Sequence, residues 1–297
     1  MFRSNNKPKS IRKLINDVAD HFAESDIYYG HGTDNAMGEA FYLVLAALDL
    51  PFDLTNAQLN QTVDPEASSS VWKLAIRRVD DRIPVAYLVN KAWFAGMPFY
   101  VNENVLIPRS PIAELIEEKF RPWIQPDTVK NILDIGTGGA CIAIACAVAF
   151  SQSRVDAVDI SPAALDVAQK NVEAYRLGKR VKLIESDLYA ALGDQKYDLI
   201  IANPPYVDAK DMRALPAEYR HEPRLALAAG DDGLDIVRRI IKNSGKHMNK
   251  EAVLIVEVGN SQPAMESAFP DLPLTWLEFE RGGEGVFLLT AEDLAGY

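Results

Sequence analysis

The first 90 residues follow the spacing of amphipathic helices. Apolar side chains recur every three or four positions along residues 11–22, which predicts a helix with one buried stripe. The stripe consists of Ile11, Leu14, Ile15, Val18 and Phe22. A polar break follows, and we expect Thr33 or Asp34 to cap a second helix that stops before Pro51. A third helix is predicted near residues 71–79, and no strand pattern occurs in this region.

The period of the apolar positions changes to two after the helical region. Residues 92–108 are typical of a β-hairpin that serves as a connector, and a helix is predicted over 111–120. Strands then alternate with helices of 10–15 residues, which indicates an α/β fold with a parallel sheet covered by helices on both faces. The expected strands are 129–135, 154–160, 181–185, 197–202 and 252–258, and the expected helices are 140–150, 162–177 and 235–241.

The C-terminal segment predicts one more hairpin, and the length and composition of the chain predict two folded domains. A terminal hairpin, 274–279 with 284–290, should add an antiparallel edge strand. The 297 residues are 48% hydrophobic and 25% charged, which fits two folded domains and excludes wholesale disorder. We expect a helical domain at 1–91, a β-hairpin linker at 92–110 and an α/β domain at 111–297.

The cysteines are compatible with a reducing cytoplasm, and the hydropathy bears on membrane contact. Cys141 and Cys146 lie in one apolar run and are expected to be small core residues without a disulfide. No stretch approaches the roughly 18 apolar residues of a membrane span, and the N-terminus lacks the apolar segment of a signal peptide. We therefore expect a cytoplasmic protein with no membrane contact. The four histidines show no metal-ligand spacing, so no metal is expected.

The negative net charge indicates which kinds of macromolecule the protein can bind. The formal charge of −11 repels a polyanion on average and attracts a basic protein. The first 13 residues are an exception because they carry five cations and no acid. Two interpretations remain open, a solvated terminus and an arm that touches RNA. The cations are Arg3, Lys7, Lys9, Arg12 and Lys13.

A glycine-rich loop follows the first strand of the α/β domain and leads straight into a helix. A dinucleotide fingerprint would need a further glycine at position 141, where this chain has cysteine. The acidic residue in the loop favours a cationic ligand over a pyrophosphate. A tight structural turn is the alternative. The residues of this candidate site are Asp134, Gly136, Thr137, Gly138 and Gly139.

Asp159 ends the second strand, 21 residues after Gly138. A carboxylate at this place accepts hydrogen bonds from both hydroxyls of a ribose. A glycine loop without the pyrophosphate pattern, combined with a ribose acceptor, indicates a nucleoside that carries no phosphate. S-adenosylmethionine fits, because its aminocarboxypropyl end and its sulfonium charge suit backbone amides and carboxylates.

The fourth strand ends in the corner Asn203-Pro204-Pro205-Tyr206. In a parallel sheet this corner lies at the same edge as the glycine loop. The side-chain carbonyl of Asn203 and the backbone carbonyl of Pro204 can accept both N–H bonds of a planar NH₂ group and favour the positive charge that develops on it. The prolines stiffen the corner, and Tyr206 can stack on the planar group. A stiff strand-ending turn without chemistry is the alternative.

These residues resemble the glutamine-specific class of S-adenosylmethionine-dependent methyltransferases, which modify a glutamine side-chain amide in proteins of the translation machinery. The corner is shared with adenine-N6 methyltransferases of nucleic acids. Segments more specific to the class are Pro84-Val85-Ala86-Tyr87-Leu88, Val105-Leu106-Ile107-Pro108-Arg109 and Glu222-Pro223-Arg224-Leu225-Ala226-Leu227, followed by Gly230 and Gly233.

One branch of this class acts on peptide chain release factors and another on large-subunit ribosomal protein L-three. The run 108–112 looks like the ribosomal branch, as do 30–35 and 91–94. The resemblance implies a seven-stranded, Rossmann-like catalytic domain, a helical substrate-recognition domain at the N-terminus, and Asp187 near the adenine. Where the family often has glycine the chain has Ala140. We expect cofactor binding to survive the added methyl group, because Gly139 can relieve crowding, and the cofactor affinity is left open.

The resemblance therefore implies methyl transfer from S-adenosylmethionine to a glutamine amide of ribosomal protein L-three. The alternatives are methylation of release factors, adenine-N6 methylation of nucleic acid, and an assembly factor without catalysis. Two features stay open. Arg109 forms either an interdomain ion pair or a substrate contact, and residues 207–229 are either a lid or a plain loop.

Overall fold

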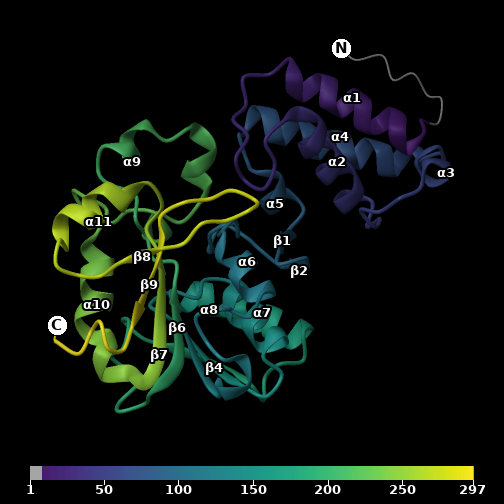
Figure 1. The fold of residues 1–297 in the computed structure, drawn as a ribbon. Helices are drawn as coiled ribbons and strands as arrows, with labels where there is room; N and C mark the ends of the chain where they lie inside the picture. Colours follow the sequence, from purple (N-terminus) through teal and green to yellow (C-terminus); the bar gives the residue numbers. More distant parts are fainter. Residues whose placement is uncertain (1–8, 297) are drawn as a thin grey trace. The chain divides into compact units, whose positions relative to one another are not determined.

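The computed structural model describes residues 9–296, and Figure 1 traces their helices and strands. The chain divides into two compact units. Unit 1 contains the chain up to Ala92 together with Pro216–His221, and unit 2 contains Trp93–Leu215 and the chain from Glu222 onward. The sequence pattern places 216–221 in the α/β domain. The structure differs because this segment carries Glu218, whose side chain is buried in unit 1.

Unit 1 is helical. The stripe predicted on the first helix is buried as expected. The second helix is capped by Asn35, whose side-chain oxygen accepts from the Gly38 N–H at 2.8 Å, so the prediction of Thr33 or Asp34 is wrong by one or two positions. The third predicted helix is longer and starts at Pro65, after Asp64, whose side chain accepts from the Glu66 and Ala67 N–H groups. The helices are α1 (Ile11–Ala23), α2 (Ala36–Ala47), α3 (Asn56–Leu59), α4 (Pro65–Asp80) and α5 (Val85–Leu88).

A buried ionic cluster holds the segment 216–221 inside unit 1. The guanidinium of Arg78, 1% exposed, donates from Nε to Glu39 Oε1 at 2.9 Å and contacts Glu218 Oε1 from Nη1 at 3.3 Å. Arg78 Nη2 also donates to the carbonyl of Tyr28 at 2.7 Å. Because a buried carboxylate needs a partner, Arg78 ties the segment to α2 and α4. Part of the open segment 207–229 is thus anchored in the helical unit.

Unit 2 begins with the predicted hairpin, which is shorter than expected because only β1 (Ala92–Phe94) and β2 (Met97–Phe99) pair. Ala92, the first residue of β1, is counted with unit 1. The main sheet has seven strands in the order β5-β4-β3-β6-β7-β9-β8. The predicted terminal hairpin is present, but its antiparallel strand β9 lies between β7 and β8, and the edge strand β8 is antiparallel only to β9. The strands are β3 (Asn131–Ile135), β4 (Arg154–Asp159), β5 (Val181–Glu185), β6 (Tyr197–Ala202), β7 (Met248–Glu257), β8 (Thr275–Trp276) and β9 (Val286–Thr290).

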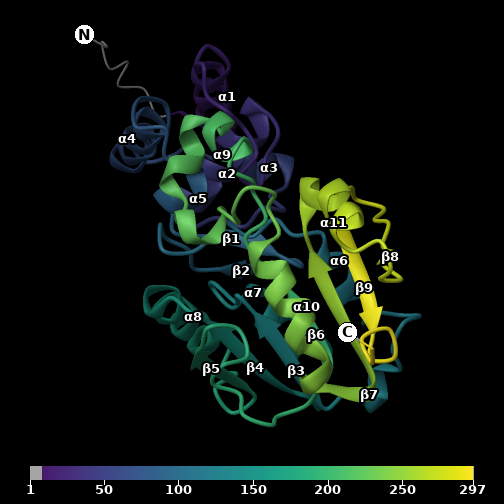
Figure 2. The same cartoon turned by 90° about the vertical axis from the view of Figure 1, so that its left-hand side faces the viewer.

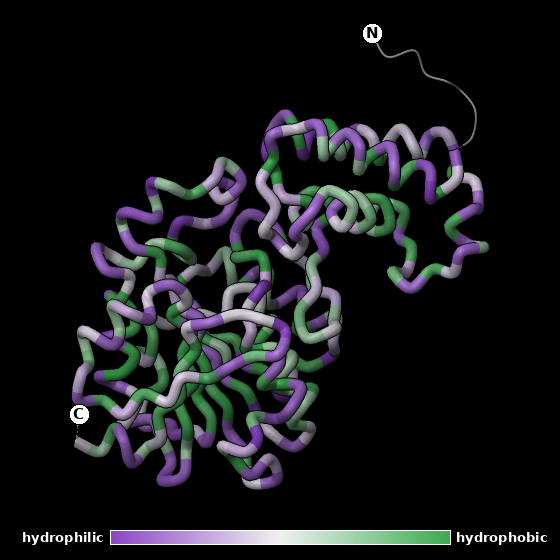
Figure 3. Tube along the Cα trace, turned by 45° about the horizontal axis from the view of Figure 1, so that its top comes forward, coloured by the Kyte–Doolittle hydropathy of each residue, from purple (hydrophilic) through white to green (hydrophobic). Residues whose placement is uncertain are grey.

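Helices cover both faces of this sheet, as Figure 2 shows. Alternate side chains of the strands pack with α6, α7 and α8 on one face and with α10 and α11 on the other. The strands are correspondingly among the most hydrophobic parts of the chain in Figure 3. The helix α10 runs six residues beyond the predicted end, and α9 and α11 were not predicted. These helices are α6 (Ile112–Glu117), α7 (Cys141–Ala149), α8 (Pro162–Ala174), α9 (Asp211–Ala214), α10 (Asp235–His247) and α11 (Gln262–Ala268).

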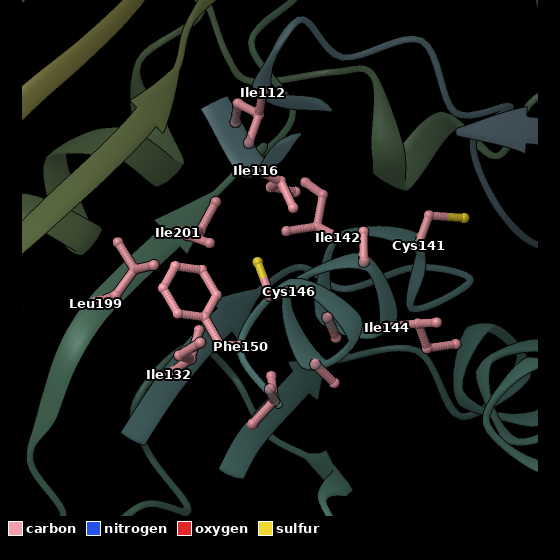
Figure 4. Packing of buried hydrophobic residues seen from close by; sticks show 14 of the residues in the cluster. Ile112, Ile116, Ile132, Cys141, Ile142, Ile144, Cys146, Phe150, Leu199 and Ile201 are labelled. Atoms are coloured by element: carbon pink, nitrogen blue, oxygen red, sulfur yellow. The ribbon is translucent and has the colours of Figure 1, made fainter. Parts of the chain in front are cut away.

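Both cysteines are free and buried in α7, which confirms the prediction of core residues. Figure 4 shows the sulfur of Cys146 among Ile201, Phe150 and Ile132, whereas Cys141 points away from this group. Burial raises the pKa of both thiols well above the ordinary value. Neither side chain is therefore suited to act as a nucleophile.

Candidate active site

A cavity of about 210 Å³ lies at the carboxyl edge of the parallel strands and is lined entirely by residues of unit 2. This is the edge at which ligands bind in open α/β sheets. Every residue that the sequence indicated for the site lines the cavity except Asp134 and Tyr206. The predicted residues in the lining are Gly136, Thr137, Gly138, Gly139, Asp159, Asp187, Asn203, Pro204 and Pro205.

The glycine loop adopts backbone angles that favour glycine. Gly136 has φ of 71° and Gly138 has φ of 52°. The N–H groups of Gly136 and Thr137 both donate to the carbonyl of Val158 at 2.9 Å, which holds the loop over the end of β4. A side chain added at Gly138 would meet nothing within 4 Å. The backbone here is therefore open to a ligand in the cavity.

Asp134 lies beneath the loop and does not line the cavity. Its Oδ2 accepts from the Thr137 hydroxyl at 2.6 Å and from the Ala143 N–H at 3.1 Å. Its Oδ1 is buried and has no hydrogen-bond partner among the residues that the structure describes. Burial raises the pKa of this carboxyl to about 7. The carboxyl group thus braces the loop and changes its charge near neutral pH.

Two further carboxylates reach the cavity from the ends of β4 and β5. Asp159 Oδ2 accepts from the Gly138 N–H at 2.8 Å, and its Oδ1 accepts from the Ser161 N–H at 2.9 Å. Asp187 is exposed and pairs with Arg239 of α10 at 2.7 Å. Arg239 also lines the cavity, and its contribution was not predicted because α10 follows the loop by 100 residues.

The corner 203–206 leaves β6 beside the glycine loop. In the register of the sheet Ile135 pairs with Ala202, so Gly136 and Asn203 continue from neighbouring positions on adjacent strands. The position of a Cβ on Gly136 would lie 4.0 Å from the Asn203 carbonyl oxygen. Tyr206 turns away, and its hydroxyl donates to Glu257 Oε1 at 2.9 Å. Stacking by Tyr206 therefore stays a prediction.

Arg109 forms an ion pair with Glu222, and both residues belong to unit 2. Its guanidinium donates to both oxygens of Glu222, at 2.6 and 2.8 Å. Glu222 also accepts from the Ile107 N–H at 3.0 Å. The pair joins two of the segments that resemble the family, and Arg109 remains part of the cavity wall. Residues 107–109 and 222 are too far apart in sequence for local patterns to reveal this contact.

Ala140 occupies the position where the family often has glycine. Its φ of 63° is left-handed, which explains the preference for glycine there. The methyl group is fully buried in the apolar cluster with α7 and does not line the cavity. The methyl group therefore does not reach the cavity, which agrees with the expectation that cofactor binding survives this substitution.

The residues present fit S-adenosylmethionine. The open backbone at Gly138 suits the amino-acid end, and the Asp159 carboxylate suits a ribose. Apolar side chains such as Ile160 and Leu188 complete the wall. Among residues 9–296 no group of His, Cys, Asp or Glu side chains is arranged to hold a metal ion. No helix in that range is long and apolar enough to cross a membrane.

Comparisons with known proteins agree with this architecture. Residues 119–218 match the family model "Methyltransferase small domain". The chain is 45% identical over 293 residues to the ribosomal protein uL3 glutamine methyltransferase of Francisella tularensis subsp. tularensis, covering 98% of this chain and 93% of the relative. It is 46% identical over 288 residues to the protein of the same name from Neisseria gonorrhoeae, covering 97% and 96%.

A solved structure shares the fold. The catalytic domain of hMettl16, solved in complex with MAT2A 3'UTR hairpin 6, aligns with a TM-score of 0.52 over 78% of this chain and 84% of that one. The identity is 18%, so this likeness concerns the fold alone. It agrees with the seven-stranded, Rossmann-like sheet described above.

Proposed function

Since the chain belongs to the family of ribosomal protein uL3 glutamine methyltransferases, we propose that it methylates a glutamine of this ribosomal protein, which is the protein L-three of the large subunit. The methyl group would pass from S-adenosylmethionine to the side-chain amide nitrogen, N5. The N–C bond would form as the S–C bond breaks, giving the N-methylamide, S-adenosylhomocysteine and one proton from the amide nitrogen. The observation that carries the proposal is the pairing of Ile135 with Ala202, which brings the glycine loop and the prolyl corner together in one cavity.

The corner orients the acceptor amide. An amide nitrogen is a poor nucleophile, because its lone pair is delocalised into the carbonyl group. The Asn203 side-chain oxygen and the Pro204 carbonyl accept its two N–H bonds and favour the charge that grows on nitrogen as the new N–C bond forms. S-adenosylmethionine supplies a methyl group on a positively charged sulfur. The prolines fix the acceptors so that nitrogen is held about 3–3.5 Å from the methyl carbon.

The remaining cavity residues hold the cofactor. Backbone groups of residues 136–139 contact its amino-acid end, while Asp159 accepts hydrogen bonds from the ribose hydroxyls. Asp187, fixed by Arg239, lies near the adenine. Asp134 acts from below the loop, where a carboxylate favours a cationic ligand over a neutral one.

In this proposal the helical unit and the basic N-terminus bind the macromolecular partners. The helical unit recognises the protein substrate, and the charge of −11 suits a basic ribosomal protein in the cytoplasm. A contact of the basic N-terminus with rRNA is a further part of the proposal. Within that segment, Arg3 and Lys7 lie outside the described residues. Lys9 and Lys13 both pair with Asp17 at 2.6 Å, so RNA would compete with this carboxylate.

A methyl-transfer assay tests the proposal. The purified chain is incubated with methyl-labelled cofactor and either ribosomal protein uL3 or a release factor, and mass spectrometry locates the label. We expect the label on one glutamine of uL3, and its loss when that glutamine is replaced by alanine. Label on the release factor alone, label on RNA, or no transfer would each overturn the proposal, the last in favour of an assembly factor without catalysis.

A further inference from the structure

Glu257, the last residue of β7, lies directly behind the prolyl corner. β7 is the neighbour of β6, with Val256 opposite Ala202, so both strands end at the same level. The Glu257 side chain is buried, and both of its oxygens accept hydrogen bonds. Oε1 accepts from the Tyr206 hydroxyl at 2.9 Å, and Oε2 accepts from the Ser110 hydroxyl.

These two hydrogen bonds connect two separate stretches of the cavity wall. Ser110 belongs to the wall segment 108–110, and Tyr206 continues the wall segment 203–205. The neighbouring Arg109 extends the connection to a third segment through its bidentate pair with Glu222. The ends of these segments are thus fixed to one another by side chains that the proposed chemistry does not itself use.

Tyr206 is held at two further points. Its backbone carbonyl accepts from the Ser261 hydroxyl at 2.8 Å. Its ring lies against Gly259, where an added Cβ would come within 2.6 Å of a ring carbon. Gly233 packs against the Tyr206 carbonyl, and a Cβ there would come within 2.3 Å. These contacts confine the ring and the carbonyl of Tyr206 in the arrangement that brings its hydroxyl to Glu257.

The protonation state of Glu257 decides the directions of its hydrogen bonds with Tyr206 and Ser110. In the ionised state of Glu257 both oxygens accept, so the phenol proton of Tyr206 points at Glu257. Burial raises the pKa of Glu257, while the two hydrogen bonds and the charge of Arg109 lower it. The groups that act on Glu257 are thus Tyr206, Ser110 and Arg109.

We propose that Glu257 is a positioning residue for the methyl transfer: it joins Tyr206 to Ser110 and thereby sets the direction in which Asn203 and Pro204 present their oxygens to the amide. This inference rests on the proposed function. Glu257 touches neither amide nor cofactor in this account, and it acts through Tyr206.

Kinetics of single variants test the proposal. Tyr206→Phe and Ser110→Ala each remove one hydroxyl that donates to Glu257. We expect each to lower kcat for uL3 about tenfold, the worth of one hydrogen bond to a charged group, while the cofactor Kd stays within about twofold. Tyr189→Phe is the matched control, because it also removes a buried phenol hydroxyl bonded to a serine, Ser244, but lies outside the cavity.

The double variant and the pH profile separate positioning from general loss of structure. Since both hydroxyls act through one carboxylate, the double variant should lose much less than the product of the single effects. The wild type should lose kcat as falling pH protonates Glu257, at a pH above the ordinary range of a glutamate. In Glu257→Gln the acid limb should lose the part that Glu257 contributes, because this side chain no longer titrates, while the part that the Asp134 carboxyl contributes remains.

Single variants as active as Tyr189→Phe, or losses of kcat matched by equal losses of cofactor affinity, would overturn the inference. If Glu257→Gln does not fold, the two hydroxyl variants and their combination still decide. A wild type that fails to label uL3 contradicts the proposed function instead, so the two failures are distinguishable.

Discussion

The carboxylate of Asp159 accepts a hydrogen bond from the backbone N–H of Gly138, with 2.8 Å between oxygen and nitrogen. This bond joins the end of β4 to the glycine loop that follows β3. Asp159 therefore has two tasks in the proposed site, to hold the loop and to offer its remaining lone pairs to a ribose. Burial raises the pKa of this carboxyl, and the N–H donors of Ser161 and Gly138 counteract that effect.

Replacement of Asp159 should weaken cofactor binding. Asp159→Ala removes the acceptor for the ribose hydroxyls, so we expect the Kd for S-adenosylmethionine to rise at least about tenfold in calorimetry. Asp156→Asn, on the same strand, is the control because its carboxylate bonds to Tyr197 outside the cavity. An unchanged Kd in Asp159→Ala would refute the ribose assignment.

Ala140 gives a prediction about the loop itself. Ala140→Gly removes left-handed backbone strain of about 1–2 kcal/mol. It also loses a buried methyl group and raises the entropy of the unfolded chain, so the free energy of unfolding should change by less than about 1 kcal/mol. The cofactor Kd should stay within about twofold, because the methyl group does not line the cavity. Ala140→Val should cost about 2 kcal/mol in thermal unfolding. A Kd that improves fivefold or more in Ala140→Gly would show that the methyl does crowd the cofactor.

The sequence predicts the sheet and its cavity well, because buried parallel strands and their glycine turns leave local signals. The strand ending at Ile135 and the corner at Asn203 are both recognisable from short segments, and the rule that ligands bind at the carboxyl edge joins them. The start of α8 is local in the same way, because its N-cap Ser161 and the proline at the first helical position are neighbours in the sequence. Cys146 is likewise confirmed as a core residue from its apolar run.

The features of the structure that the sequence did not predict depend on contacts between residues far apart in the chain. Glu257 meets Ser110 across 147 positions, and Arg78 meets Glu218 across 140. A carboxylate at either place looks like any other charged residue until the fold supplies its partner. For the same reason the assignment of Pro216–His221 to the helical unit could not be read from composition.

Asp134 makes stability depend on pH. Its folded pKa of about 7 lies above the ordinary value of 3.8, so the folded state holds the proton more tightly than the unfolded state. The free energy of unfolding should therefore fall relative to Asp134→Asn as pH rises from about 4.5 to 8, by an upper bound on the order of 4 kcal/mol. Urea unfolding at several pH values measures this difference. A difference that stays constant with pH would contradict the raised pKa.

The buried arginine of unit 1 should be essential for its stability. Arg78→Met removes the guanidinium that the buried carboxylates of Glu39 and Glu218 share, and Glu218 keeps its pair with Arg82. The loss should cost about 3–5 kcal/mol in thermal or chemical unfolding, mostly through Glu39. Arg77→Met is the matched control on the same helix. The Arg77 side chain is exposed and pairs with Asp81 at the surface. Loss of this ion pair should lower the free energy of unfolding by less than about 0.5 kcal/mol. Equal effects of the two substitutions would exclude a structural role for the ionic cluster.

The orienting role of the prolyl corner is tested most directly by single-turnover methyl transfer with Asn203→Ala, at saturating S-adenosylmethionine and uL3. Asn249→Ala, at the start of β7 and outside the cavity, is the control. We predict that the rate constant for transfer falls about 10²–10³-fold in Asn203→Ala while the cofactor Kd stays within about twofold. A rate constant equal to that of the control would contradict the claim that Asn203 aims the amide at the methyl group.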